Sequence, residues 1–117
     1  MSRPLHHQIV ARAREIIADR DHWTQGELAV FRDGRAAEPT HADAYAFCAV
    51  GALQRAAHEL SSARASSLAD QVQMLIESFA ATCRDPNTDF SLEILNDDNG
   101  HAAVLLLFDH YLAADVA

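Results

Sequence analysis

The most reactive side chain of this sequence belongs to Cys48, in the stretch AFCAVGALQRAA at 46–57. A nucleophilic cysteine needs a lowered pKa and a base within hydrogen-bonding reach. His101 is the candidate base, and Asn96 or Asp97 would orient its imidazole, which gives a cysteine–histidine–asparagine arrangement. With these residues in contact, the protein would be a cysteine-dependent enzyme.

The sequence around Cys48 favours another interpretation. We expect a helix at 41–60, which places Cys48 about two turns inside it, where the electrostatic effect of the helix N-terminus has faded. The adjacent residues Phe47, Ala49 and Val50 are apolar, and a cysteine among such residues behaves as a small hydrophobic side chain. We therefore predict that Cys48 packs in the core and that the protein has no catalytic residue.

The segment NDDNGH at 96–101 is the second candidate site. Alternating oxygen-bearing side chains and a glycine are similar to a calcium-binding loop, but the closing glutamate is missing. The simpler interpretation is that these side chains cap the following helix, with Asp98 or Asn99 at its N-terminus. Contact with a ligand or partner is the alternative, for which the candidate binding residues are Trp23, Asn96, Asp97, Asp98 and His101.

Trp23 is the only tryptophan of the chain. One interpretation is that its ring closes the end of the bundle against Gly26 or Gly51, and the other is that it stands partly exposed as a binding hot spot. A further hypothesis is a small-molecule pocket between helices, bounded by Trp23, Tyr45 and Phe47.

Motifs for metals and cofactors are missing from the sequence. The histidines form no HxxxH pair and no HExxH motif, and Cys48 and Cys83 form no CxxC. The chain has no lysine, which excludes Schiff-base chemistry and a lysine-dependent phosphate loop. We expect neither a metal nor a cofactor.

The charge of the chain indicates its partners. The net charge of -8 would repel phosphates, so we expect no nucleic acid. Residues 85–117 contain acids and no arginine, which favours another protein with a basic surface as the partner.

The longest strongly apolar run, 102–108, is far shorter than the roughly 20 residues that cross a bilayer. No signal-peptide pattern opens the chain, so we expect a cytoplasmic protein without membrane contact.

The apolar pattern predicts one domain, residues 1–117, that is mainly α. We expect a compact bundle of about four helices, at 4–19, 41–60, 68–83 and 99–114. Asp33-Gly34 predicts a small β-hairpin or irregular excursion between the first two helices. Thr24 and Glu27 have capping-box spacing and predict a helical turn before that hairpin.

A glycine inside the second helix and the wide apolar surface of the last helix both indicate close packing against another element. Gly51 costs about 1 kcal/mol in a helix interior relative to alanine, and the close approach of another helix or a ring would explain it. The last helix is apolar nearly all round, because Leu106 and Leu107 widen the stripe of Val104 and Phe108. Such a helix is either central to the bundle or half of a homodimer interface.

Three stretches carry a resemblance: WTQGELAVFRDGR at 23–35, CAVGALQRAA at 48–57 and LNDDNGHAAVLLLFDHYL at 95–112. Their Trp-x-x-Gly, Cys-x-x-Gly-Ala-Leu and Asn-Asp motifs resemble a small uncharacterised family of bacterial and phage-encoded proteins. Family members often carry Trp before the cysteine, and Phe47 keeps an aromatic ring there. The resemblance implies a fold and a set of positions, and it implies no chemistry.

The missing catalytic motifs lead to the functional prediction. We expect a non-catalytic protein-binding module of accessory, inhibitor or immunity type that acts through the acidic last third. The alternatives are a cysteine-dependent enzyme and a small-molecule-binding helical domain.

Overall fold

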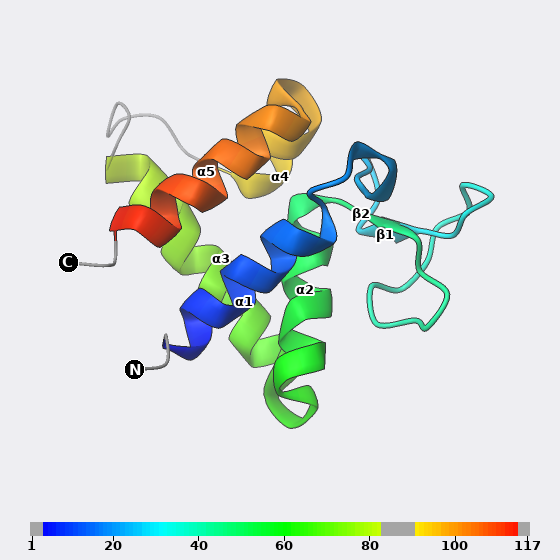
Figure 1. The fold of residues 1–117 in the computed structure, drawn as a ribbon, viewed down its shortest axis with the longest axis horizontal. Coiled ribbons are helices and arrows are strands. Elements are labelled where there is room, and N and C mark those ends of the chain that lie inside the picture. The colour runs from blue at the N-terminus through cyan, green and yellow to red at the C-terminus, as the bar shows by residue number, and fades with distance from the viewer. Residues whose placement is uncertain (1–3, 83–90, 115–117) are drawn as a thin grey trace.

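A computed structural model of the chain describes residues 4–82 and 91–114. Its elements follow one another from the N-terminus to the C-terminus as helices, a small sheet and further helices (Figure 1). The longer helices are α1 (Leu5–Ile16), α2 (Ala49–Leu60), α3 (Ala65–Thr82) and α5 (His101–Ala114). The shorter elements are η1 (Arg20–His22), β1 (Ala29–Val30), β2 (Ala46–Phe47), η2 (Ser62–Arg64), α4 (Leu92–Ile94) and the π-helical turn η3 (Leu95–Asn99). The predicted mainly α bundle with an excursion between its first two long helices is confirmed.

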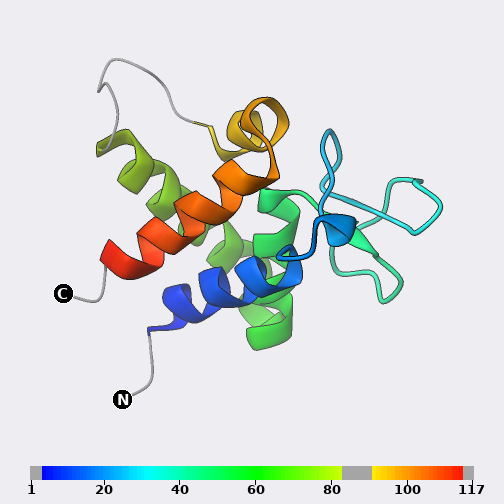
Figure 2. The ribbon, with the colours of Figure 1, turned by 45° about the horizontal axis from the view of Figure 1, so that its top comes forward.

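The helices form because apolar residues recur at helical spacing and meet in one core. On α1 the side chains of Ile9, Val10 and Ala13 are completely buried. They face α2, where Ala52 and Ala56 are also completely buried, and such small side chains allow two helices to approach closely. Figures 1 and 2 show α1 crossing α2 and lying beside α5.

The last helix, α5, packs against α1 and α3. Its Val104, Phe108 and Tyr111 are buried, and the Tyr111 ring lies 5.7 Å from that of Phe79 on α3. Leu106 points the other way and is 55% exposed. The homodimer interface, which was the alternative to a central position of this helix, stays a prediction.

The excursion, residues 18–48, leaves the bundle between α1 and α2 and projects from one end of it (Figure 2). Strands β1 and β2 pair antiparallel, with Ala29 opposite Phe47. Beyond β1 the chain turns back at Asp33-Gly34, where Gly34 has φ 92°, and Val30 forms a bridge with Ala36. The predicted hairpin at this turn is therefore confirmed.

The predicted start of the second helix, at residue 41, is wrong. Residues 46–47 are a strand, and α2 begins at Ala49. The Tyr45 amide donates to the Val30 carbonyl at 2.8 Å, and the Cys48 amide donates to the Leu28 carbonyl at 3.1 Å. These long-range bonds keep the backbone extended although its sequence is rich in helix-forming alanine.

The helical turn predicted from Thr24 and Glu27 is wrong as well. The Thr24 amide donates to the Phe47 carbonyl at 3.0 Å, so this segment runs beside β2 rather than coiling. The first turn of 3-10 helix lies earlier, at Arg20–His22.

The segment before the last helix also differs from its prediction. A short helix α4 continues through η3, and Gly100, with φ 92°, separates η3 from α5. Asp98 and Asn99 therefore belong to a turn that precedes α5, and the residue before the helix is glycine. Cys83 lies outside the described residues. No helix among the described residues is long and apolar enough to cross a membrane.

Candidate functional site

Asn96 is at the centre of the candidate site and is completely buried. Its Oδ1 accepts hydrogen bonds from Trp23 Nε1 at 2.7 Å and from the Ala49 amide at 2.9 Å. Its Nδ2 donates to the Thr24 carbonyl and to Asp97 Oδ1, both at 3.0 Å. An amide side chain has two acceptor lone pairs and two donors, and all of them are used here. Asn96 therefore joins η3, the excursion and the start of α2.

The bond to Ala49 means that Asn96 caps a helix other than the one predicted. The first amides of α2 have no acceptor within the helix, and the Ala49 amide finds one 47 residues further along the chain. The prediction named Asp98 or Asn99 as the cap of the last helix, whereas in the structure Asn96 caps α2.

Asp97 extends the same network to the loop of Gly26. Its Oδ1 accepts from the Gly26 amide at 3.1 Å. Gln25 Nε2 donates to the carbonyls of Asn96 at 3.2 Å and Asp97 at 2.9 Å. No local pattern predicted a role for Gln25, because its role depends on a contact between distant segments.

Cys48 is the N-cap of α2 and not a residue two turns inside it, which corrects the predicted position. Its Sγ accepts a bond from the Gly51 amide at 3.3 Å, and the residue is 6% exposed. A helix N-terminus usually lowers a thiol pKa. Here burial raises the pKa of Cys48, with a further upward contribution from the Asp97 and Glu93 carboxylates, and this outweighs the bonds from Gly51 and Val50.

Gly51 lies directly against the backbone of the excursion. A Cβ at this position would be 1.8 Å from the Leu28 carbonyl oxygen, which no side chain can occupy without movement of the backbone. The same oxygen accepts from the Cys48 amide. A close approach was predicted for Gly51, but the neighbour is the backbone of the bend before β1 rather than a helix or a ring.

His101 is hydrogen-bonded to a backbone carbonyl, and no hydrogen bond joins it to Cys48. Its Nε2 lies 2.6 Å from the Ile17 carbonyl oxygen, which can only accept, so this nitrogen carries the proton. The centres of the His101 and Trp23 rings lie 5.3 Å apart. The Arg20 guanidinium lies 5.9 Å from the centre of the same Trp23 ring. The half-buried Trp23 is therefore fixed between η1, η3 and the start of α5.

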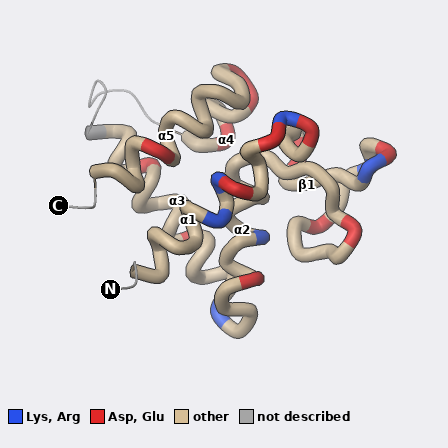
Figure 3. The backbone as a smooth tube through the Cα atoms, viewed as in Figure 1, with Lys and Arg blue, Asp and Glu red and all other residues tan. Residues whose placement is uncertain are grey.

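A cavity of about 200 Å³ opens beside this network. We call it the acidic notch, and its lining residues are Gly26, Glu27, Leu28, Cys48, Glu93, Asn96 and Asp97. Carboxylates from the excursion and from α4–η3 converge here, and none of the arginines that the structure describes lines the notch. Figure 3 shows the acidic residues that follow α4 at this end of the molecule.

The structure brings most of the predicted site residues together. Trp23, Asn96 and Asp97 share one hydrogen-bond network, and His101 packs on Trp23. Asp98 is exposed and is not part of the notch lining. Within 4–82 and 91–114, no group of three or more His, Cys, Asp or Glu residues is arranged to hold a metal ion.

Comparison with known proteins identifies the family of this chain. The model of DUF6197, a family of unknown function, matches residues 1–114, and the chain belongs to this family. No curated protein and no solved structure matches the chain significantly.

Proposed function

We propose that this member of DUF6197 is a non-catalytic protein-binding module that receives a basic side chain of its partner in the acidic notch. The observation that carries the proposal is the convergence of Glu27, Glu93 and Asp97 around one cavity without a lining arginine. Glu27 and Glu93 are exposed and make no hydrogen bond or ion pair among the described residues, so their charges are available to a partner. Complementary charge of this kind directs association and selects partners.

Leu28 adds an apolar part to the same surface. It lines the notch and is 40% exposed. A guanidinium or ammonium group on an aliphatic stem would therefore meet carboxylates at its head and an apolar side chain along its length.

Charge reversal tests this proposal. The partner captured from the native host by the wild-type protein should be lost from a Glu27→Lys, Glu93→Lys variant. Asp97 is left unchanged because it bonds the Gly26 amide, and its loss would disturb the fold. The matched control is Asp70→Lys, an exposed acid of α3 away from the notch. If the double variant captures the same partner with the same affinity, the notch is not the contact surface.

The cysteine-enzyme alternative makes an opposite prediction for Cys48. Because its thiol is buried and its pKa is raised, we expect slow alkylation by iodoacetamide at neutral pH. The measurement uses a Cys83→Ser background, followed by mass spectrometry, with denatured protein as the control. A thiol that reacts in the folded protein as fast as in the denatured chain would favour the enzyme hypothesis over the non-catalytic binding module.

A further inference from the structure

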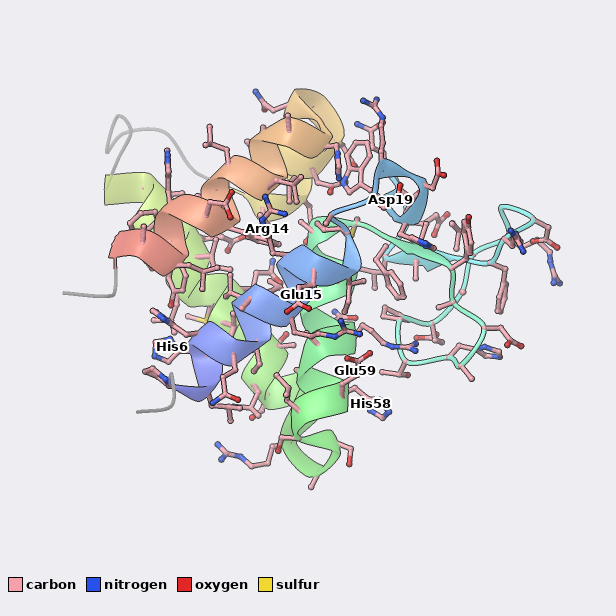
Figure 4. All side chains as sticks on the ribbon, viewed as in Figure 1. His6, Arg14, Glu15, Asp19, His58 and Glu59 are labelled. Carbon is pink, nitrogen blue, oxygen red and sulfur yellow. The ribbon has the colours of Figure 1, made fainter. Side chains whose placement is uncertain are left out.

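A second concave surface, which shares no lining residue with the notch, lies between α1, α2 and β2. We call it the arginine groove; its volume is about 340 Å³. Its charged lining residues are Arg12, Glu15, Arg55 and Glu59, and its rings are His22, Tyr45 and Phe47. Figure 4 shows Glu15 of α1 and Glu59 of α2 on the same face of the molecule. Tyr45 and Phe47 are two of the three residues predicted to bound a small-molecule pocket, while Trp23 is not part of this lining.

The two arginines of this groove have N–H donors that no described residue accepts. Arg12 Nε donates to Glu59 Oε1 at 2.7 Å, and Arg55 Nε donates to Glu59 Oε2 at 3.2 Å. Arg55 Nη1 also donates to the carbonyls of Pro39 and His41. Among the described residues, no acceptor bonds the Nη2 of either arginine. A guanidinium has five N–H donors, and two that face one groove can hold a further carboxylate.

The aromatic rings supply a surface for a flat apolar body. The rings of His22 and Tyr45 lie 4.6 Å apart, and His22 Nδ1 is held 2.7 Å from the Tyr45 carbonyl oxygen. The Arg55 guanidinium lies 5.8 Å from the centre of the Phe47 ring. Arg32 lies 5.3 Å from the centre of the Tyr45 ring and has no carboxylate partner among the described residues.

The charge balance limits the ligand to a small negative charge. Within the lining, Glu15 and Glu59 offset Arg12 and Arg55. Arg32 does not line the groove, but its guanidinium lies over the Tyr45 ring and adds one positive charge beside it. A phosphate dianion would be repelled by the two carboxylates, whereas a single carboxylate matches this added charge. We propose that the arginine groove binds a small aromatic monocarboxylate, with its carboxylate at Arg12 and Arg55 and its ring beside His22 and Tyr45. This inference is independent of the acidic notch.

Three probes of the same shape test the charge requirement. The probes are 3-phenylpropionate, 3-phenylpropanol and 3-phenylpropylamine, each titrated into ¹⁵N-labelled full-length protein and followed by backbone amide shifts. The carboxylate should produce saturable shifts at Tyr45, Phe47 and Arg55, and the alcohol and the amine should not. Equal shifts with the alcohol, or no saturable shift with the carboxylate, would overturn the proposal.

Two variants separate binding from folding. Arg12→Gln removes a donor and should weaken binding of the carboxylate by about fivefold or more. Glu59→Gln removes the internal competitor for both guanidiniums and should strengthen it. Both variants lose the same Arg12–Glu59 ion pair. A purely structural effect would therefore change the affinity for the carboxylate in the same direction in both variants. A change in the same direction contradicts the proposal. Arg64→Gln, an exposed arginine outside the groove, is the control and should bind like the wild type.

Discussion

At the scale of single residues, Gly51 is under the strictest steric demand. Replacement of a helical glycine by alanine normally stabilises a helix by about 1 kcal/mol. Here the new Cβ would be placed 1.8 Å from the Leu28 carbonyl oxygen. We therefore expect Gly51→Ala to lower the free energy of unfolding by about 1–3 kcal/mol, because overpacking forces the backbone to move. Urea denaturation measures this change. A variant as stable as the wild type would show that the backbone at Leu28 moves at little cost in free energy.

Asn96 supports a prediction that depends on pH. Asn96→Asp keeps the acceptors for Trp23 and Ala49 but places a carboxylate where a donor faces the Thr24 carbonyl and Asp97. Burial beside another carboxylate should raise the pKa of the new group above its unfolded value. The variant should therefore lose most stability at neutral pH and regain part of it as the pH falls toward about 4. The measurement is the difference in urea midpoint between variant and wild type at each pH, and Asn96→Ala, which cannot titrate, should show no such recovery.

At the scale of elements, ion pairs connect α1 to its two neighbours. Arg12 meets Glu59 of α2, and Arg14 Nε and Nη2 donate to the two carboxylate oxygens of Asp109 on α5 at 2.8 and 3.2 Å. Burial alone would raise the pKa of Glu59, but the bonds from Arg12 and Arg55 outweigh it and lower that pKa. The bond from Arg14 lowers the pKa of Asp109 in the same way.

A lowered folded-state pKa fixes the sign of the pH effect. The stabilisation from Glu59 and Asp109 is complete above the ordinary pKa of these groups, about 4, and disappears as the pH falls through their folded-state values. We expect the urea midpoint of the wild type to fall between about pH 5 and about pH 3 more than that of a Glu59→Gln, Asp109→Asn variant. Identical pH profiles would mean that these half-exposed pairs contribute nothing measurable, as many surface pairs do.

The elements also show what the sequence can and cannot predict. Apolar spacing located the long helices, since Ile9 and Ala13 or Val72 and Ile76 are buried as the period requires. The β2 strand was missed because its hydrogen bonds to residues 28–30 override a local preference for helix. Segment 96–101 was expected to cap the last helix through Asp98 or Asn99. Local sequence cannot predict that Asn96 caps α2 instead, because this acceptor is 47 residues from its donor.

Across the molecule, the described arginines all lie before α3, whereas acids occur throughout the fold. The arginines that bond or stack in the structure lie on α1, α2 and the excursion. The charged residues of α4 and η3, in contrast, are all acids. Figure 3 shows acidic and arginine segments next to one another on the excursion, and acidic segments alone at α4. The acidic notch and the arginine groove have no lining residue in common: the charged residues of the notch are all carboxylates, whereas the groove contains both arginines and glutamates.

The position of Asn96 has a consequence for the order in which the protein can be completed on the ribosome. A nascent chain that ends before residue 96 already contains α1, α2, α3 and the excursion. It nevertheless lacks the acceptor for the Trp23 indole and for the first amide of α2. The excursion can reach its final arrangement only after η3 has emerged, so translation of the last segment is the step that fixes it.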